Sequence, residues 1–290
     1  DSVESLKAAY PEATTYDGVW VCAPEGTNRS LLFIVEGETI VKIDMAEGLD
    51  GQDTNPAGIE VKQNKETLMF GYEKESFLNL PTPTHYLPAL SKKLGVEFYM
   101  KRDDLTEFGA GGNKLRKLEY FIHDAKKKRA TTLLTVGGAQ TNHGRLTAAV
   151  AAKFGMKCVI VAMDEYPGEL SANLLLDRIM GAEVVLHKED GTRLMDVVEA
   201  VKQRYEDMGE TVYFIPMGGS NALGDLGYYE CALELIEQEK DGRVIVTVGS
   251  MGTYMGLFCG LHGSDLRLTG VLIGPFYEDV REYALTQFEQ

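Results

Sequence analysis

Short β-branched segments alternate with amphipathic segments from about residue 115 onward, and this alternation constrains the fold more than any other feature of the sequence. We expect strands at residues 131–136, 157–163, 183–186, 211–215, 243–248 and 268–273. Between them, apolar side chains recur three and four positions apart, as on the buried face of a helix, at residues 115–128, 145–154, 172–180 and 194–208 and after Ser220-Asn221. Strands and helices in this order form parallel sheets covered by helices, so the sequence predicts an α/β fold.

Residues 1–75 lack this alternation. Two apolar segments, residues 31–35 and 39–43, are separated by Glu-Gly-Glu, which is typical of a β-hairpin. No chemically reactive motif is recognisable in this region. We therefore interpret residues 1–75 as a separate N-terminal appendage of unknown role, and we favour a structural or oligomerisation element.

The composition is that of an ordinary globular protein, with 290 residues of which 44% are hydrophobic and 25% are charged. The longest apolar runs, such as residues 159–163, are far shorter than the about 18 residues that a membrane-spanning helix needs. No basic-then-apolar leader precedes Asp1. The four cysteines lie far apart and include no C-x-x-C pair, so neither a zinc site nor a disulfide framework is indicated. These features predict a cytoplasmic protein that is not embedded in a membrane.

The net charge is −15, from 44 acidic and 29 basic residues. Nucleic acids and anionic membranes attract proteins with a positive field, so this balance argues against both as partners. An anion must instead be held locally. Backbone N–H groups in a glycine-rich turn or at a helix N-terminus hold anions whatever the net charge of the protein is.

A glycine-rich turn directly precedes the first predicted helix. Residues 109–114 read Gly-Ala-Gly-Gly-Asn-Lys, so Lys114 stands where a turn opens into a helix. A lysine held close to a ligand at this position can have a lowered pKa and can form a Schiff base. The alternative is an ordinary solvated lysine, and this turn alone does not separate the two interpretations.

A second polar turn follows the strand predicted at residues 131–136. It reads Gly-Gly-Ala-Gln-Thr-Asn-His over residues 137–143, at the carboxyl end of a strand, where open α/β sheets bind ligands. Its amides and side chains can hold a carboxylate. Thr141 and Asn142 are equally consistent with simple helix caps, and His143 with either a catalytic base or a packed side chain.

A third turn, residues 249–256, follows the strand predicted at residues 243–248 and reads Gly-Ser-Met-Gly-Thr-Tyr-Met-Gly. Small residues let backbone amides approach a phosphate, and Ser250 and Thr253 add hydroxyl donors. The turn contains no Walker sequence, and it lacks the acidic residue that completes a dinucleotide-binding fingerprint. We therefore predict a phosphate site for a ligand other than ATP or NAD.

A Schiff-base lysine, a carboxylate-binding turn and a phosphate site are together explained by one ligand, pyridoxal 5′-phosphate with an amino-acid substrate. The sequence resembles the family of D-cysteine desulfhydrase and 1-aminocyclopropane-1-carboxylate (ACC) deaminase, which are tryptophan-synthase-β-like, fold type II pyridoxal-phosphate enzymes. The resemblance covers about residues 76–275. Its motifs are residues 81–84 (Pro-Thr-Pro-Thr), 101–106 (Lys-Arg-Asp-Asp-Leu-Thr), 111–119 (Gly-Gly-Asn-Lys-Leu-Arg-Lys-Leu-Glu), 140–143 (Gln-Thr-Asn-His) and 218–224 (Gly-Gly-Ser-Asn-Ala-Leu-Gly).

The resemblance implies a role for each turn. Lys114 is expected to be catalytic and to bind the cofactor covalently, and Thr141 is expected to be the second catalytic residue. Asn142, with Gln140 and the Thr141 hydroxyl, is expected to receive the substrate carboxylate or the cofactor ring. The phosphate is expected to lie on the turn formed by Gly249, Ser250, Met251, Gly252 and Thr253.

The resemblance also implies an architecture. Two open, twisted, parallel-sheet α/β domains are expected to enclose the cofactor, a larger one from residues 76–116 and 216–290 and a smaller one from residues 117–215. The C-terminal part of the larger domain is expected to be missing from the sequence, because the family's Asp-Pro-Val-Tyr-Thr-Gly-Lys-like and His-Thr-Gly-Gly-like segments do not occur. The resemblance further implies a homodimer.

Residues 218–224, followed by Gly227-Tyr228, resemble the desulfhydrase branch. This favours β-elimination from D-cysteine, giving pyruvate, ammonia and sulfide. ACC deaminase and a lyase for another β-substituted alanine such as cysteate are the alternatives within the class. A non-catalytic, truncated relative that keeps the fold is the alternative outside it. Two departures from the family pattern lie in the predicted site, Thr141 in place of the usual serine and Met251 in place of glycine or alanine.

Overall fold

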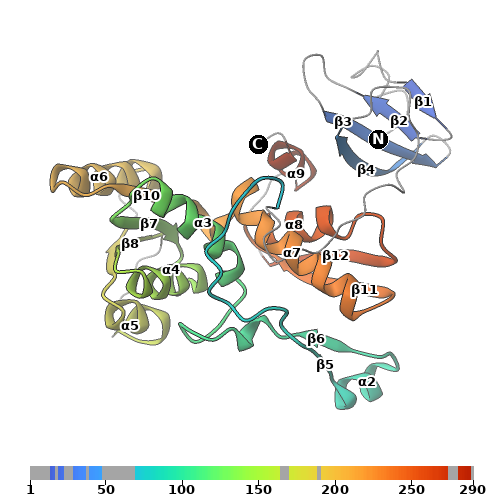
Figure 1. Cartoon of the computed structure of the whole chain (residues 1–290), viewed down its shortest axis with the longest axis horizontal. Coiled ribbons are helices and arrows are strands. Elements are labelled where there is room, and N and C mark those ends of the chain that lie inside the picture. Colours follow the sequence, from blue (N-terminus) through green and yellow to red (C-terminus); the bar gives the residue numbers. More distant parts are fainter. Residues whose placement is uncertain are drawn as a thin grey trace. The chain divides into compact units, whose positions relative to one another are not determined.

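The computed structural model describes residues 69–163, 170–187, 191–273 and 280–288, together with the backbone of residues 14–16, 19–22, 29–36 and 39–47. The chain divides into two compact units, Asp1–Thr67 and Leu68–Gln290 (Figure 1). The domain ranges expected from the sequence stay predictions. Within the described ranges, no helix is both long and apolar enough to span a membrane.

The first unit contains an antiparallel sheet with the strand order β1-β2-β3-β4. Its strands are β1 (Thr14–Tyr16), β2 (Val19–Cys22), β3 (Arg29–Glu36) and β4 (Thr39–Glu47). Strands β3 and β4 form the predicted hairpin and pair from Glu36 with Thr39 to Arg29 with Glu47. The hairpin strands are longer than expected because polar residues at both ends continue the ladder.

A four-stranded parallel sheet with the order β10-β7-β8-β9 forms the first part of the second unit. Its strands are β7 (Thr132–Gly137), β8 (Lys157–Ala162), β9 (Glu183–Leu186) and β10 (Val212–Ile215). Helices α4 (Asn142–Lys153), α5 (Ala172–Ile179) and α6 (Leu194–Asp207) connect them. All six strand segments that the sequence predicts in this unit are confirmed within two residues at each end.

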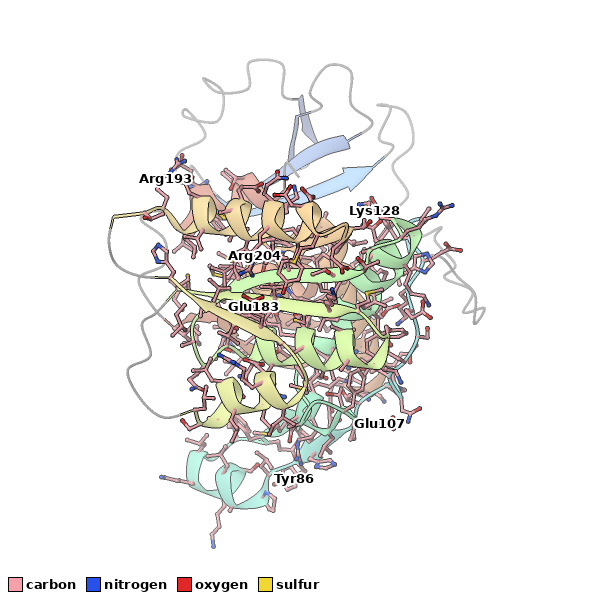
Figure 2. The ribbon with its side chains drawn as sticks, turned by 90° about the vertical axis from the view of Figure 1, so that its left-hand side faces the viewer. Tyr86, Glu107, Lys128, Glu183, Arg193 and Arg204 are labelled. Carbon is pink, nitrogen blue, oxygen red and sulfur yellow. The ribbon has the colours of Figure 1, made fainter. Side chains whose placement is uncertain are left out.

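Helices cover both faces of this sheet, with α6 on one side and α4 and α5 on the other (Figure 2). Successive residues of a strand point to opposite faces. Leu134 therefore packs in one apolar cluster with Val198 of α6, whereas Leu133 packs in another with Leu146 of α4. Burial on both faces explains why β8 is a nearly continuous apolar run and why β7 is buried along its whole length.

Three helices and a second parallel sheet form the other part of this unit. They are α3 (Leu115–Lys127), α7 (Ala222–Gln238) and α8 (Gly252–Gly260), with the strand pair β11 (Gly242–Val248) and β12 (Leu266–Leu272). Tyr228 and Leu235 of α7 pack with Leu257 of α8 in the apolar cluster beneath the strands. Helix α9 (Val280–Phe288) follows β12.

An antiparallel pair, β5 (Thr84–Tyr86) and β6 (Tyr99–Lys101), lies before the lysine turn, with the short helix α2 (Pro88–Leu94) between the strands. Two single 3₁₀ turns follow, η2 (Asp103–Leu105) and η3 (Met217–Gly219). The first precedes the lysine turn, and the second contains the two glycines that begin the motif at residues 218–224. The expected start of α4 near residue 145 is wrong, because Thr141 caps the helix and it begins at Asn142.

Candidate active site

The turn before Lys114 has an unusual backbone. Gly109, Ala110, Gly111 and Gly112 all have positive φ, at 63°, 62°, 67° and 141°. A side chain at Gly111 would place its Cβ 2.1 Å from the carbonyl oxygen of Asp104, so only glycine fits there. The amide of Gly112 donates to the Thr106 hydroxyl over 2.9 Å, which folds the turn back onto η2. Lys114 is the N-cap residue of α3.

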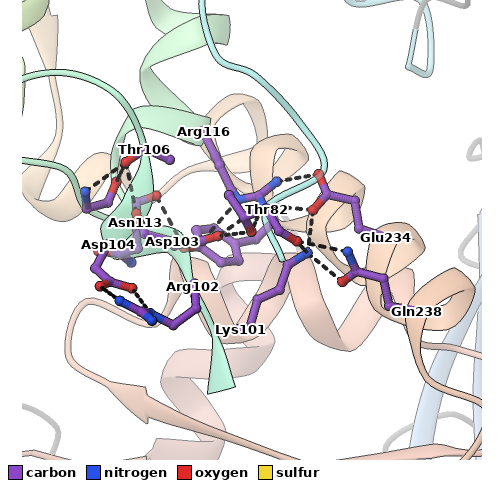
Figure 3. Close-up of polar contacts among 12 residues, drawn as sticks. Thr82, Lys101, Arg102, Asp103, Asp104, Thr106, Asn113, Arg116, Glu234 and Gln238 are labelled. Carbon is purple, nitrogen blue, oxygen red and sulfur yellow. Dashed lines mark hydrogen bonds and ion pairs between the residues drawn. The ribbon is translucent and has the colours of Figure 1, made fainter. Parts of the chain in front are cut away.

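A network of buried charged side chains lies beside this turn (Figure 3). Arg116 is 1% exposed. Its Nη2 donates to Asp103 Oδ1 and to Thr82 Oγ1, both over 2.9 Å, and its Nη1 donates to Glu234 Oε1 over 2.7 Å. Burial alone would raise the pKa of Asp103, but the charge and hydrogen bonds of Arg116 outweigh it and lower that pKa.

Tyr228 connects this network to the lysine turn. Its hydroxyl lies 2.7 Å from Asp103 Oδ2 and 3.2 Å from the carbonyl oxygen of Asn113, the residue before Lys114. The backbone that carries Lys114 is therefore held by α7 as well as by α3. A lysine on a backbone fixed in this way is restrained to a small volume, which favours a covalent role over a freely solvated one.

Lys114 has a strongly lowered pKa of about 7. Burial is the largest cause, the positive charge of Lys117 adds to it, and Asp225 opposes it. At neutral pH a large fraction of such a lysine is the unprotonated amine, which is the nucleophilic form. This property fits the predicted Schiff-base role.

Lys117 and Asp225 lie at the predicted phosphate turn, and the sequence analysis did not identify either of them. Lys117 is fully buried. A Cβ built on Gly252 would lie 2.3 Å from Asp225 Oδ1, 2.5 Å from Lys117 Nζ and 2.6 Å from Ser220 Oγ. Lys117 was recognisable in principle, because it stands three residues after Lys114 and so shares its helix face.

Hydrogen bonds link the phosphate turn to two other motifs. Ser220 Oγ lies 2.7 Å from Ser250 Oγ and accepts from the Gly252 amide over 3.1 Å. Asn113 Nδ2 lies 3.5 Å from Thr253 Oγ1. The structure thus brings the lysine turn and the phosphate turn together, although they are more than 130 residues apart. The first turn of α8 also offers amide groups without helical acceptors, as every helix N-terminus does.

Met251 adopts φ of 68° and ψ of −36°, a conformation that non-glycine residues rarely adopt. Its side chain is 4% exposed and packs in an apolar cluster with Val248 and Met255, against which Val280 of α9 also packs. Packing therefore holds the strained residue in place. The side chain lies in that cluster, so Met251 can contribute only its backbone to the phosphate turn.

The polar turn at residues 137–143 is held by α5. Asn142 Oδ1 accepts from Asn173 Nδ2 over 3.1 Å. Gln140 Oε1 accepts from the Asn173 amide over 2.9 Å, and Gln140 Nε2 donates to the Ser171 carbonyl. Both side chains are exposed at the surface of the described structure. Their predicted roles in substrate binding stay predictions.

Thr141 is the N-cap of α4. Its hydroxyl oxygen accepts from the amides of His143 over 3.2 Å and Gly144 over 3.4 Å. These bonds use the lone pairs of the oxygen and leave the hydroxyl hydrogen available to donate. Capping and substrate binding are therefore compatible at this residue, and its catalytic role stays a prediction.

His143 is buried and its ring is part of the core. Nε2 lies 3.0 Å from Thr135 Oγ1, which donates to the carbonyl of Ile215 over 2.8 Å. Burial lowers the pKa of His143 to about 3, and the charges of Lys114 and Lys117 add to the effect. A histidine with such a pKa is a poor proton acceptor at neutral pH. The structure therefore favours the packed side chain over the catalytic base.

Comparison with known proteins places the chain in a family. A sequence model described as pyridoxal-phosphate dependent enzyme matches residues 76–278. The chain belongs to this family of pyridoxal-phosphate-dependent enzymes, and its fold is that of fold type II. A pyridoxal 5′-phosphate-dependent aspartate racemase, 23% identical with a TM-score of 0.53 over 66% of this chain and 56% of its own, shares the fold.

Two similar relatives carry the two names that the motifs predicted. A putative ACC deaminase of Thermotoga maritima is 46% identical over 187 residues, which are 62% of this chain and 59% of that protein. A D-cysteine desulfhydrase of Salmonella typhimurium is 42% identical over 214 residues, 70% of this chain and 65% of its own. A crystal structure of an ACC deaminase homologue superposes with a TM-score of 0.70 at 36% identity, covering 75% and 68% of the two chains.

The aligned regions span about three fifths to two thirds of the length of these relatives. The predicted membership in the D-cysteine desulfhydrase and ACC deaminase family is confirmed. The residues also fit the family's cofactor, because a buried cation, Lys117, lies at a glycine turn on a helix N-terminus, next to a lysine with a lowered pKa.

Proposed function

We propose that this chain carries the lysine and the phosphate site of a pyridoxal-phosphate-dependent lyase that acts on a small amino acid. D-cysteine is the favoured substrate. One observation carries the proposal: Lys114, with a pKa lowered to about 7, is one helical turn from Lys117, whose amine lies against the glycine turn at Gly252. An amine of this kind beside an anion site matches the aldehyde and the phosphate of a single cofactor.

Each residue of the site has a separate role in this proposal. Lys114 would hold the cofactor covalently, and Lys117 with the amides and hydroxyls of residues 249–253 would hold its phosphate. When bound, pyridoxal 5′-phosphate withdraws electrons from the substrate Cα and so acidifies its hydrogen. Lys114, released as a neutral amine, would accept that proton. Thr141, Asn142 and Gln140 would bind the substrate carboxylate at the N-terminus of α4.

For D-cysteine, the overall reaction consumes one water and gives pyruvate, ammonia and hydrogen sulfide. The motif at residues 218–224 supports the desulfhydrase. If Gly218 of this motif were replaced by a residue with a side chain, its Cβ would lie 2.1 Å from Ser250 Oγ. The motif therefore packs closely against the phosphate turn. The ACC deaminase names among the relatives support the other candidate, which would yield ammonia and a four-carbon keto acid from ACC.

The test is to purify the protein with pyridoxal 5′-phosphate and to follow visible absorption, sulfide and keto-acid release. Lys114→Ala should lose the covalently bound cofactor and all turnover, because the neighbouring amine of Lys117 lies at Gly252, where it would hold the phosphate. D-cysteine, ACC and cysteate are supplied in turn to identify the substrate. Bound cofactor with no product from any of them would support the non-catalytic relative, and a borohydride-reducible cofactor in Lys114→Ala would refute the assignment of the lysine.

Location in the cytoplasm and assembly as a homodimer are further parts of this proposal. They are supported by the resemblance and by the spacing of the cysteines. Light scattering of the purified protein measures the mass in solution directly. A mass of a single 32.0 kDa chain would contradict the homodimer.

A further inference from the structure

One buried guanidinium connects the lysine turn with the polar turn at residues 137–143. Arg145, in the first turn of α4, is 6% exposed. Its Nη2 lies 3.1 Å from the carbonyl oxygen of Gly111 and 3.2 Å from Asn142 Oδ1. Gly111 belongs to the turn that positions Lys114, and Asn142 belongs to the turn predicted to bind the substrate. A single nitrogen therefore fixes the distance between two segments that come from different parts of the chain.

Helix α5 supports Arg145 from behind. Asn173 in its first turn donates to Asn142, and Asp177, four residues later on the same helix face, lies near Arg145. Asp177 is 1% exposed, and both of its carboxylate oxygens, like Arg145 Nη1, lack a hydrogen-bond partner among the described residues. Burying these charged groups is costly unless they serve one another or a neighbouring site.

We propose that Arg145 is a positioning residue that holds Asn142 at a set distance from the Lys114 turn, with Asp177 as the counter-charge that keeps Arg145 in place. The inference rests on the proposed function of Lys114 and Asn142. It adds one requirement to that function: the distance between the lysine that bonds the cofactor and the turn that binds the substrate carboxylate must be fixed. A displacement of about 1 Å at such a site can reduce the rate about a hundredfold.

A packing role alone explains the contacts less well. The side chain donates to two oxygen atoms on two different turns, whereas an apolar side chain of similar length would fill the same space without the cost of burying a charge. The two readings predict different measurements. A packing role affects only stability, and a positioning role affects turnover in a protein that still folds and still binds the cofactor.

The test compares Arg145→Met with the native holoenzyme. Methionine keeps much of the length and removes every donor. We expect the visible absorption of bound cofactor to remain, kcat/KM to fall about 10- to 100-fold, and KM to rise because Asn142 is displaced. Arg145→Lys, which keeps the charge, should recover part of the loss. Arg193→Met is the matched control, because Arg193 is an exposed arginine that pairs with Asp196 on one helix surface.

Asp177→Asn serves as the second variant, because it keeps the shape and removes the charge behind Arg145. It should raise KM and shift the pH at which the absorption of the bound cofactor changes. A folded Arg145→Met protein with a lower melting temperature and native kcat and KM would overturn the proposal. If Arg145→Met does not fold, native KM and an unshifted pH profile in both Arg145→Lys and Asp177→Asn would overturn it. Absence of cofactor from the native protein would instead refute the proposed function.

Discussion

Two buried arginines face carboxylates beside the candidate site, and their surroundings differ. All three side-chain nitrogens of Arg116 donate to oxygen atoms, of Asp103, Glu234 and Thr82 (Figure 3). Both hydrogen bonds of Arg145 come from Nη2, whereas its buried Nη1 and both carboxylate oxygens of Asp177 have no hydrogen-bond partner among the described residues. The lysine side of the site is thus held by a complete network, and the predicted substrate side by an incomplete one.

The difference separates two uses of a buried charge. A complete network is stiff, because moving any member leaves several charged groups without partners. An incomplete pair loses fewer hydrogen bonds and ion pairs when its members move. We therefore expect the Lys114 turn to tolerate little change, and the turn at Asn142 to be the one whose position depends on substitution and on pH.

The largest expected effect comes from breaking the complete network. Arg116→Met would leave Asp103 buried without its cation and Glu234 with Lys101 alone, which should lower the free energy of unfolding by about 3–5 kcal/mol. Urea denaturation measures this loss. Arg145→Met should cost clearly less, because it removes fewer bonds. Equal losses in the two variants would contradict the contrast between the two arginines.

The next effect tests the incomplete pair through its pH dependence. Burial raises the pKa of Asp177 to about 7 against the opposing charge of Arg145, and the thiol of Cys158 on β8 also faces it. The unfolded carboxyl titrates near pH 4. The stabilisation of the folded protein by the neutral Asp177 carboxyl is thus fully present below about pH 4. It is lost as the pH rises toward 7, because the carboxyl ionises at a lower pH in the unfolded chain than in the folded protein.

The side chain that Asp177→Asn introduces does not ionise, so the variant should not lose this stability as the pH rises. Between pH 4 and pH 7 the stability of Asp177→Asn should therefore fall less than that of the native protein, by a few kcal/mol at most, at about 1.4 kcal/mol for each pKa unit. Unfolding curves at pH 4, 5.5 and 7.5 provide the measurement. Asp196→Asn, at an exposed ion pair, should leave the slope nearly unchanged. The same slope in Asp177→Asn as in the native protein would rule out a raised pKa.

A smaller effect is expected at Thr141, on the same side of the site. Thr141→Val keeps the shape but removes the cap, which should cost about 1 kcal/mol of stability, and it removes the donor, which should cost about 1–3 kcal/mol of transition-state binding. Thr141→Ser should retain both. Melting temperature and kcat/KM, measured on one preparation, distinguish the two roles. A loss of stability with native kcat/KM would leave only the cap.

The smallest effect is expected at Met251, on the lysine side. Met251→Leu preserves the volume in the cluster with Val248 and α9, so it should change stability by less than about 1.5 kcal/mol. Cofactor affinity should not change, because the side chain packs away from the anion site. Equilibrium titration with pyridoxal 5′-phosphate checks this. Weaker binding would mean that the side chain itself contacts the phosphate.

The local pattern of polar and apolar residues was sufficient to predict most helices and strands of the second unit. Strand β9 was predicted at its observed bounds because its apolar run ends at sharp changes of polarity. The predicted start of α4 near residue 145 is three residues late because Gly144 lies inside the helix, although Thr141 is one of the two cap candidates in the sequence. The turn at residues 249–253 stands out because small residues follow directly on a strand, and its role as a phosphate site stays a prediction.

Other parts of the site could not be predicted from local pattern. Lys117 and Asp225 lie 108 residues apart, and their pairing at Gly252 exists only after α3 and α7 pack together. Arg145 and Asp177 are likewise joined only by the packing of α4 on α5. Single-sequence patterns report the period of a helix or strand and its ends, but they do not report which distant charge a buried side chain meets.

The reach of the Arg116 network has a consequence for the order of folding. Glu234 lies 118 residues from Arg116, and Tyr228 lies 125 residues from Asp103. Contacts between such distant residues form late, because the entropy of closing a long loop is lost before the contact repays it. The reactive lysine is therefore assembled only near the end of folding, after the sheet of β7 and β8. In pulse-labelling hydrogen exchange, amides of residues 109–114 should gain protection after those of β7, so that an unfinished chain does not present the nucleophilic amine.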